Sequence, residues 1–246
     1  MEKQKPQTPS EVLPNKLALV TIDGPAGVGK TTLARLLATH LGVSYLDTGA
    51  MFRTLALKLG EKGSELTAEE LTAECAKLNF ALEGLGEQTT LLCNQVAVGQ
   101  EIRTEKIALL ASNLAKKPEI RSFLCQAQRE LGAKYPLVCE GRDMGTVVFP
   151  EACCKFFLEA TAEVRAKRRL LDQKNVGEKL DLATLAAQIR LRDEQDRTRA
   201  IAPLIPAKDA YLIDTSTLSL KEVLDCMLKY LEQSGAAKFF PNKQAN

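Results

Sequence analysis

Residues 17–32 constrain the fold of this chain more than any other stretch. They begin with a mainly apolar run, residues 17–22, which is typical of a strand buried on both faces of a sheet. A glycine-rich loop follows, and leucines then recur at the spacing of one helix face. The loop fits the pattern G-x-x-x-x-G-K-[ST]. In this pattern, backbone N–H groups of the loop and the start of the next helix surround phosphate oxygens.

Individual residues of the loop predict how a nucleotide would be bound. Lys30 can reach the β- and γ-phosphates, and the hydroxyl group of Thr31 can bind Mg²⁺. The alternative is a chance glycine-rich turn, but the strand, the loop and the helix all fall where the motif needs them. The residues predicted to bind the nucleotide are Gly24, Pro25, Ala26, Gly27, Val28, Gly29, Lys30, Thr31 and Thr32.

Charge and composition limit the classes of function. The chain has 246 residues, 26% of them charged, and a formal net charge of +2. This balance gives no overall field that would attract nucleic acid or a membrane, so an anion site must come from local clustering. No apolar run is long enough to cross a bilayer. The single histidine, His40, excludes a catalytic histidine pair and a metal site with several histidine ligands.

The two ends of the chain and its cysteines carry weaker signals. Residues 1–15 are polar, contain several prolines and lack the apolar core of a signal peptide, so we expect a flexible leader. The seven cysteines are scattered, without a C-x-x-C pair. Reduced cysteines and the lack of an export signal favour the cytoplasm. We expect residues 235–246 to be a frayed tail.

The remaining apolar runs predict the fold class. Strands are expected at residues 43–46, 137–139, 154–158 and 210–213, with helical spacing in most of the intervals. Strands that alternate with helices indicate an α/β fold with a parallel sheet.

Residues 60–117 differ from this alternation. A capping box at Thr67 and Glu70 predicts a helix that runs to about Leu78. The short runs that follow are separated by close turns and predict a small antiparallel sheet. These runs are residues 79–82, 89–93 and 96–98. The sheet would form an insertion beside the main one.

Residues 161–199 hold most of the concentrated charge. Leu182, Leu185 and Ile189 form an apolar stripe at helical spacing. The same stripe continues through three charged residues, Arg192, Asp196 and Arg199. Two arginines with a carboxylate between them can clamp a phosphate and a sugar, because a guanidinium group binds oxyanions through two parallel hydrogen bonds.

The alternative for this helix is a solvated face with ion pairs four residues apart, such as Asp193 with Arg197. We favour that alternative for the neighbours Arg190, Asp193, Glu194 and Arg197, and the clamp for the three residues on the stripe.

Five blocks of sequence together resemble the bacterial cytidylate kinases. They are residues 24–32, 46–53, 101–104, 141–150 and 197–204. The block Gly-Arg-Asp-Met-Gly-Thr that begins at Gly141 is highly specific in combination with the others, whereas the phosphate loop alone indicates only nucleotide binding. The resemblance covers about residues 17–231.

The resemblance implies a doubly wound parallel sheet with helices on both faces, in a single kinase domain of residues 16–234. It implies a monophosphate-binding insertion at about residues 60–117 and a helical lid at about residues 165–199. The implied reaction moves the γ-phosphoryl group of ATP, with Mg²⁺, to CMP or dCMP. These small molecules are the expected partners, without nucleic acid or a membrane, and we expect a monomer.

The resemblance also implies which residues bind the acceptor nucleotide. They are Thr48, Arg53, Ser112, Arg121, Arg142, Asp143, Arg192, Asp196 and Arg199. The residues expected to act in catalysis are Lys30, Arg142, Arg192 and Arg199. Thr48 stands where serine is common in the family and keeps the hydroxyl group. Gln195 stands where the family often has another charged residue.

The carboxylate of Asp143 could explain why the protein would prefer cytosine to uracil. A carboxylate can accept a hydrogen bond from the N4 amino group of cytosine. Uracil presents an oxygen at that position, so two acceptors would face each other at a cost of roughly 1–3 kcal/mol. We therefore expect CMP to be preferred over UMP. The alternative is that Asp143 is only a structural partner of a nearby arginine.

Two other functions compete with this interpretation. One is another small-molecule kinase with the same loop, acting on UMP or shikimate. The other is a nucleotide switch or an ATPase stimulated by nucleic acid, in which the arginines bind RNA or DNA. The near-neutral net charge and the lack of aromatic stacking platforms argue against the second.

Overall fold

The first strand of the chain is the central strand of the main sheet. The computed structural model describes residues 17–172 and 181–241. Its five parallel strands lie in the order β2-β6-β1-β7-β8. Their bounds are Leu17–Asp23 for β1, Ser44–Asp47 for β2, Leu137–Gly141 for β6, Ala152–Glu159 for β7 and Tyr211–Asp214 for β8. The strands β2 and β6 lie on one side of β1, and β7 and β8, which come later in the chain, lie on the other side. The predicted doubly wound fold is therefore confirmed.

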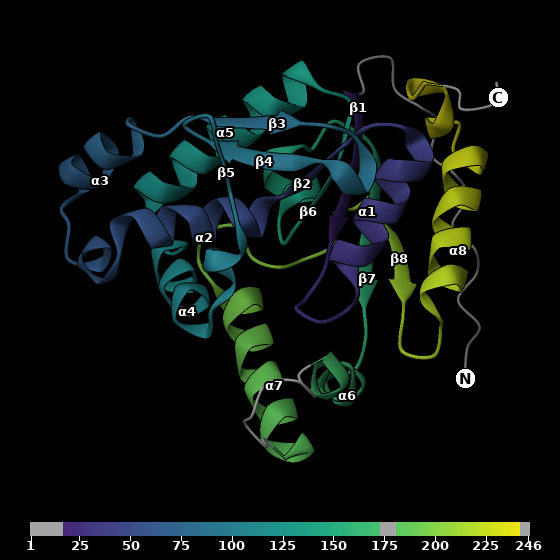
Figure 1. The fold of residues 1–246 in the computed structure, drawn as a ribbon. Helices are drawn as coiled ribbons and strands as arrows, with labels where there is room; N and C mark the ends of the chain where they lie inside the picture. Colours follow the sequence, from purple (N-terminus) through teal and green to yellow (C-terminus); the bar gives the residue numbers. More distant parts are fainter. Residues whose placement is uncertain (1–16, 173–180, 242–246) are drawn as a thin grey trace.

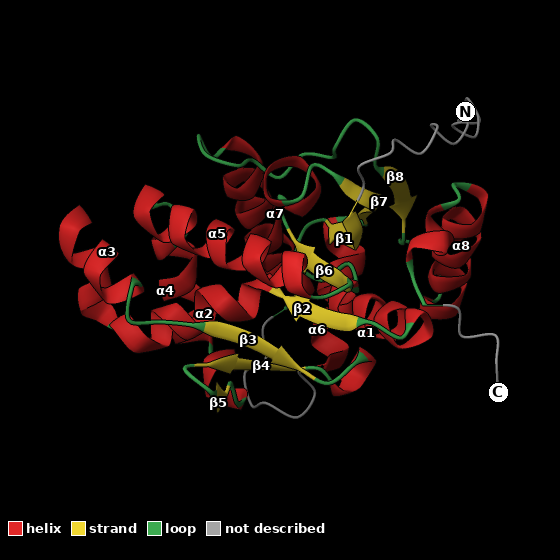
Figure 2. Ribbon diagram, turned by 90° about the horizontal axis from the view of Figure 1, so that it is seen from above, coloured by secondary structure: helices red, strands yellow, loops and turns green. Residues whose placement is uncertain are grey.

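Helices cover both faces of this sheet (Figures 1 and 2). One face carries α1 (Lys30–Leu41) and α8 (Leu220–Gln233), and the other carries α2 (Thr48–Leu59), α4 (Glu105–Leu114) and α5 (Pro118–Lys134). Successive side chains of a strand point to opposite faces. In β1, Leu19 therefore packs into the core beside α2, while Val20 and Ile22 pack into the core beside α1. The prediction of a strand buried on both faces is confirmed.

The predicted insertion contains a separate antiparallel sheet. Its strands are β3 (Phe80–Glu83), β4 (Thr90–Cys93) and β5 (Val96–Ala97), in that order. Figure 2 shows this sheet beside β2, at the edge of the main sheet. The backbone N–H of Gly86 donates to the carbonyl of Val43 at 2.8 Å and ties the insertion to the core.

The helix at the start of the insertion is shorter than predicted. The capping box at Thr67 and Glu70 is present, but α3 (Ala68–Cys75) ends before Leu78. The N–H of Leu78 donates to the carbonyl of Cys75 at 2.9 Å, so the chain tightens into a turn. The side chain of Asn94 then bonds to the N–H of Asn79 at 2.7 Å and draws the chain toward β3.

Two helices lie beyond the carboxyl end of the main sheet, α6 (Ala162–Asp172) and α7 (Leu182–Thr198) (Figure 1). They pack on each other through a small cluster of their own that includes Ala166, Leu185 and Ile189. This cluster is separate from the two cores of the main sheet, so the pair of helices forms its own small unit.

Short turns of helix complete the described chain. The 3₁₀ turns are Glu61–Ser64, Gly86–Gln88, Gln100–Arg103 and Ala236–Phe239, and a π-helical turn spans Met144–Val148. The last 3₁₀ turn corrects an expectation for residues 235–241, because Ala236 and Phe240 are buried in the core beside α8 instead of fraying. The leader at residues 1–15 and the end of the tail lie outside the described residues. None of the helices within the described ranges has the length and apolar character to span a bilayer.

Candidate active site

Two adjoining cavities meet beside the glycine-rich loop. The first, of about 640 Å³, lies between the loop, α6 and the start of α8, and we call it the donor cavity. The second, of about 350 Å³, lies between the loop, α2, α4 and α7, and we call it the acceptor cavity. Both are lined by Ala26, Gly27, Lys30, Thr31 and Glu140. Open parallel sheets bind ligands at this edge, beyond the carboxyl ends of the strands.

Glycine is required where the loop leaves β1. Gly24 has a φ of +147°, and a Cβ atom there would lie 2.2 Å from the carbonyl oxygen of Leu158. Gly27 and Gly29 also have positive φ, at +83° and +92°, which L side chains rarely adopt. The buried side chain of Lys30 folds back over the loop, and its Nζ donates to the carbonyl of Pro25 at 2.7 Å. Burial and the charge of Arg142 lower the pKa of Lys30.

Most of the predicted loop residues face a cavity. Ala26, Gly27, Val28, Gly29, Lys30, Thr31 and Thr32 line the donor cavity. Gly24 and Pro25 line neither cavity, and their contacts with Leu158 and Lys30 shape the loop instead.

All nine residues predicted to bind the acceptor line the acceptor cavity. They are Thr48, Arg53, Ser112, Arg121, Arg142, Asp143, Arg192, Asp196 and Arg199. These residues come from α2, α4, α5, the loop after β6, α7 and the turn that follows α7. The fold therefore gathers them from segments far apart in the sequence.

Several guanidinium groups of this cavity lie beside carboxylates. Arg142 Nε lies 3.0 Å from Asp196, and Arg53 lies 2.9 Å from Asp47. Asp143 pairs with Arg121 and lies 3.5 Å from Arg199. Burial raises the pKa of Asp143, and the charges of Arg121 and Arg199 oppose that rise. The structural alternative for Asp143 thus has direct support, since two arginines pair with its carboxylate.

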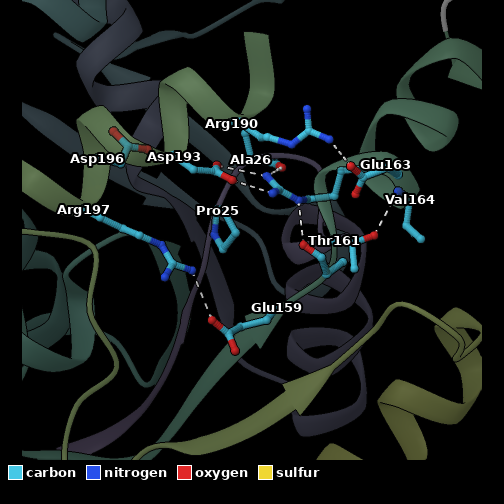
Figure 3. A network of polar contacts seen from close by, with 12 residues as sticks. Pro25, Ala26, Glu159, Thr161, Glu163, Val164, Arg190, Asp193, Asp196 and Arg197 are labelled. Atoms are coloured by element: carbon cyan, nitrogen blue, oxygen red, sulfur yellow. Dashed lines mark hydrogen bonds and ion pairs between the residues drawn. The ribbon is translucent and has the colours of Figure 1, made fainter. Parts of the chain in front are cut away.

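The apolar stripe of α7 behaves as predicted. Leu185 and Ile189 are buried against α6, and farther along the helix Arg192 and Asp196 line the acceptor cavity. The predicted pair of Asp193 with Arg197 is wrong. Figure 3 shows Asp193 beside Ala26 and Arg197 directed toward Glu159. Arg197 lies 3.3 Å from Glu159. Asp193 instead pairs with Arg165, because packing of α7 on α6 offers it a buried partner.

Glu140 is the most important residue that the sequence prediction missed. It is buried at the end of β6, lines both cavities and accepts a hydrogen bond from the hydroxyl of Tyr45 at 2.5 Å. Burial and the charge of Asp47 raise the pKa of Glu140, and the charge of Lys30 and the hydrogen bond from Tyr45 oppose that rise. The sequence feature that could have identified Glu140 is its position, as a charged residue directly after the buried run at 137–139.

Two other missed residues shape the acceptor cavity. Asp23, at the end of β1, accepts from the N–H groups of Met144 at 2.9 Å and Gly145 at 2.8 Å, so it holds the loop that carries Arg142. Burial raises the pKa of Asp23 to about 6. Arg103, from a 3₁₀ turn of the insertion, lines the same cavity. Its Nη2 lies 3.7 Å from Asp47.

A divalent cation has two suitable protein ligands here. The hydroxyl of Thr31 and the carboxylate of Glu140 both line the two cavities. Oxygen ligands of this kind suit Mg²⁺, which commonly takes one or two protein groups and completes its shell with phosphates and water. Within the described chain, no three His, Cys, Asp or Glu side chains form a metal-binding group. The donor set therefore fits Mg²⁺ held together with a nucleotide.

Comparisons with known proteins agree with this geometry. The family described as "Cytidylate kinase" matches residues 20–233. A cytidylate kinase from Nitratidesulfovibrio vulgaris is 52% identical over 218 residues, which are 89% of this chain and 94% of the relative. One from Oleidesulfovibrio alaskensis is 51% identical, covering 87% and 98%, and one from Lawsonia intracellularis is 46% identical, covering 87% and 95%. The predicted resemblance is confirmed, and the chain belongs to the cytidylate kinase family.

Proposed function

We propose that this protein transfers the γ-phosphoryl group of ATP to CMP and dCMP. One observation carries the proposal beyond family membership. The donor and acceptor cavities share Lys30, Thr31 and Glu140, so nucleotides in the two cavities would meet at these side chains. Transfer between two nucleotides needs their reacting oxygen and phosphorus atoms held in line and close together.

The donor side of the proposal assigns ATP to the donor cavity. Loops of this type bind polyphosphate through backbone N–H groups, and Lys30 adds a positive charge at the end of the chain of phosphates. Thr31 and Glu140 would hold Mg²⁺, directly or through water. The cation would supply charge neutralisation on the transferring phosphoryl group.

The acceptor side assigns CMP to the cavity lined with arginines. Arg53, Arg142 and Arg199 are suited to the phosphate, because planar guanidinium groups bind oxyanions through paired hydrogen bonds. Ion pairs with Asp47, Asp196 and Asp143 would hold these three guanidinium groups in place until the phosphate binds. Asp196 and Arg192, one turn apart on α7, are suited to the sugar.

The chemistry needs no protein base. A phosphate oxygen of CMP is already an anion and attacks the γ-phosphorus as the bond to the bridging oxygen of ADP breaks. Lys30, Arg142, Arg192 and Arg199 would neutralise the charge that the two nucleotides share. Water must be excluded, or it would take the phosphoryl group instead of CMP.

We assign the exclusion of water to movement of two segments beside the main sheet, residues 165–199 and residues 60–117. The helices α6 and α7 have a small core of their own, which supports the interpretation of residues 165–199 as a lid. Arg103 reaches the acceptor cavity from residues 60–117, which supports that segment as the monophosphate-binding insertion. Both would belong to a single kinase domain of residues 16–234.

The pair of Arg121 and Asp143 is the proposed reader of the base. Its carboxylate is buried, and both residues line the acceptor cavity. Ser112, on α4, lines the same cavity and can add a hydroxyl group to that recognition. We further propose a monomer that works in the cytoplasm on these small molecules, without nucleic acid or membrane partners.

A panel of acceptors tests the proposed function. Formation of ADP is measured with ATP, Mg²⁺ and one of CMP, dCMP, UMP, AMP or shikimate. We expect rapid ADP formation with CMP and dCMP and much slower formation with the others. ADP formation that requires added RNA or DNA and ignores CMP would overturn the proposal.

A further inference from the structure

One ion pair outside the nine acceptor residues links the lid to the glycine-rich loop. Arg165, on α6, has a side chain that is 4% exposed, and its partner Asp193, on α7, is 15% exposed. Arg165 Nη1 donates to Asp193 Oδ1 at 3.0 Å, and Nη2 donates to Asp193 Oδ2. Two parallel hydrogen bonds between a buried guanidinium group and a partly buried carboxylate fix the relative position of the two groups.

The same guanidinium group also holds the backbone of the loop. Nη1 donates to the carbonyl of Ala26 at 3.2 Å, and Nε donates to the carbonyl of Ala160 at 2.9 Å. A Cβ atom on Gly27 would lie 3.3 Å from the Cβ of Arg165, so the loop packs closely on the stem of this side chain. Arg165 thus joins three parts of the molecule, namely the loop, the end of β7 and α7.

Holding the Ala26 carbonyl fixes the orientation of a peptide group inside the loop. In a trans peptide the C=O group and the following N–H group point in opposite directions. The bond from Arg165 to Ala26 therefore decides where the N–H of Gly27 points. Because such loops bind phosphate through their N–H groups, the orientation of this peptide affects the donor cavity.

Asp193 connects this contact to the acceptor side. It lies on α7 next to Arg192 and three residues before Asp196, both of which line the acceptor cavity, while Arg165 lines the donor cavity. We propose that Arg165 and Asp193 are a positioning pair that ties the loop to α7 and keeps the loop in its donor-binding conformation. The assignment of ATP to the donor cavity rests on the proposed function, and the contacts that position the loop do not.

A second ion pair provides a matched control. Arg190, on α7, pairs with Glu163, on α6, so it joins the same two helices (Figure 3). These side chains are 57% and 52% exposed and line neither cavity. If ion pairs only hold α6 against α7, breaking either one should have the same effect on nucleotide binding.

The test measures binding of the non-hydrolysable ATP analogue AMP-PNP, with Mg²⁺, to the full chain by calorimetry. We expect Asp193→Asn to weaken AMP-PNP binding about tenfold and to change CMP binding less than about twofold, because the donor loop loses its support. Arg190→Gln should bind both nucleotides as the unmodified protein does. Melting curves show that each variant is folded at the temperature of the titration.

A second variant, Arg165→Lys, tests the same role if Asp193→Asn fails to fold. Arg165→Lys keeps a positive charge beside Asp193 but lacks the fork that reaches Ala26, so it should also lose AMP-PNP affinity. Unchanged AMP-PNP affinity in either folded variant, or an equal loss in Arg190→Gln, would overturn the positioning role. Binding of AMP-PNP needs no acceptor, so a failed acceptor panel would refute CMP phosphorylation without deciding this question.

Discussion

Arg142 faces the acceptor cavity from the loop directly after β6, and its Nε pairs with Asp196 at 3.0 Å. Its side chain is 23% exposed, and its partner comes from α7 instead of the main core. The residue therefore contributes more positive charge to the cavity than packing to the fold. Loss of such a side chain should affect turnover more than stability.

We predict that Arg142→Ala lowers kcat roughly 10²–10³-fold, the usual effect of removing one group that stabilises transition-state charge. Its melting temperature should fall by less than about 3 °C. Steady-state kinetics and calorimetry measure the two effects. Arg197→Ala removes the exposed ion pair between α7 and Glu159, so it serves as the control and should keep normal turnover. An Arg142→Ala protein that melts early and turns over normally would show a structural role.

Asp143 combines a structural contact with a proposed recognition role. Asp143 forms ion pairs with Arg121 and Arg199. Because Asp143→Asn weakens both ion pairs, we expect it to slow the reaction with every acceptor. The ratio of kcat/KM for CMP to that for UMP separates recognition from general damage. We predict that this ratio falls about five- to 150-fold, corresponding to about 1–3 kcal/mol. Asp47→Asn, which also loses an arginine pair in this cavity, should leave the ratio unchanged. Full preference for CMP in Asp143→Asn would refute base reading by the carboxylate.

At the level of elements, the end of β1 supports both cavities. Gly24 starts the glycine-rich loop, and the preceding Asp23 holds the π-helical turn at Met144 and Gly145. One strand end therefore places the donor loop and the loop that carries Arg142. Asp23 is buried, and its two backbone hydrogen bonds only partly offset the rise in pKa that burial causes.

This arrangement predicts a pH dependence of stability. The pKa of Asp23 rises from 3.8 to about 6 on folding, so the folded protein keeps a proton that the unfolded chain has released. The stability due to this group is present below its unfolded pKa and is lost as the pH rises through about 6. The free energy of unfolding, compared with that of Asp23→Asn, should fall by up to about 3 kcal/mol between pH 4 and pH 7. Urea titrations of both proteins measure the difference, and parallel pH profiles would contradict it.

Elements defined by local sequence were predictable. The glycine-rich loop, the capping box at Thr67 and the start of α5 at Pro118 each depend on residues close together in the chain. The continuation of the α7 stripe to Arg192 and Asp196 follows from helical spacing.

Ion pairs between side chains on different elements could not be predicted in the same way. Asp193 is four residues from Arg197, yet it pairs with Arg165 because α6 packs on α7. The sequence alone does not say which helix faces which. Likewise, Arg103 reaches the acceptor cavity only because the insertion folds against α2. The resemblance to a family predicted nine residues that line one cavity, and tertiary packing decides which carboxylate an arginine such as Arg142 meets.

At the scale of the whole molecule, the proposed reaction requires two nucleotides to bind in the adjoining cavities, which meet at Lys30. The doubly wound sheet supplies the donor loop at the end of β1. Residues 60–117 and α7 bring arginines and a carboxylate to the acceptor cavity from the other side. A single ligand that spans both cavities would use every part of this arrangement at once.

The most direct measurement is the binding of adenosine and cytidine joined through their 5′ positions by five phosphates. Calorimetry compares this probe with ADP and with CMP, and competition kinetics are run against each substrate. We predict that the probe binds roughly 100-fold more tightly than ADP, because the second half binds at high effective concentration, and that it competes with both ATP and CMP. A probe that binds no more tightly than ADP and competes only with ATP would contradict the account.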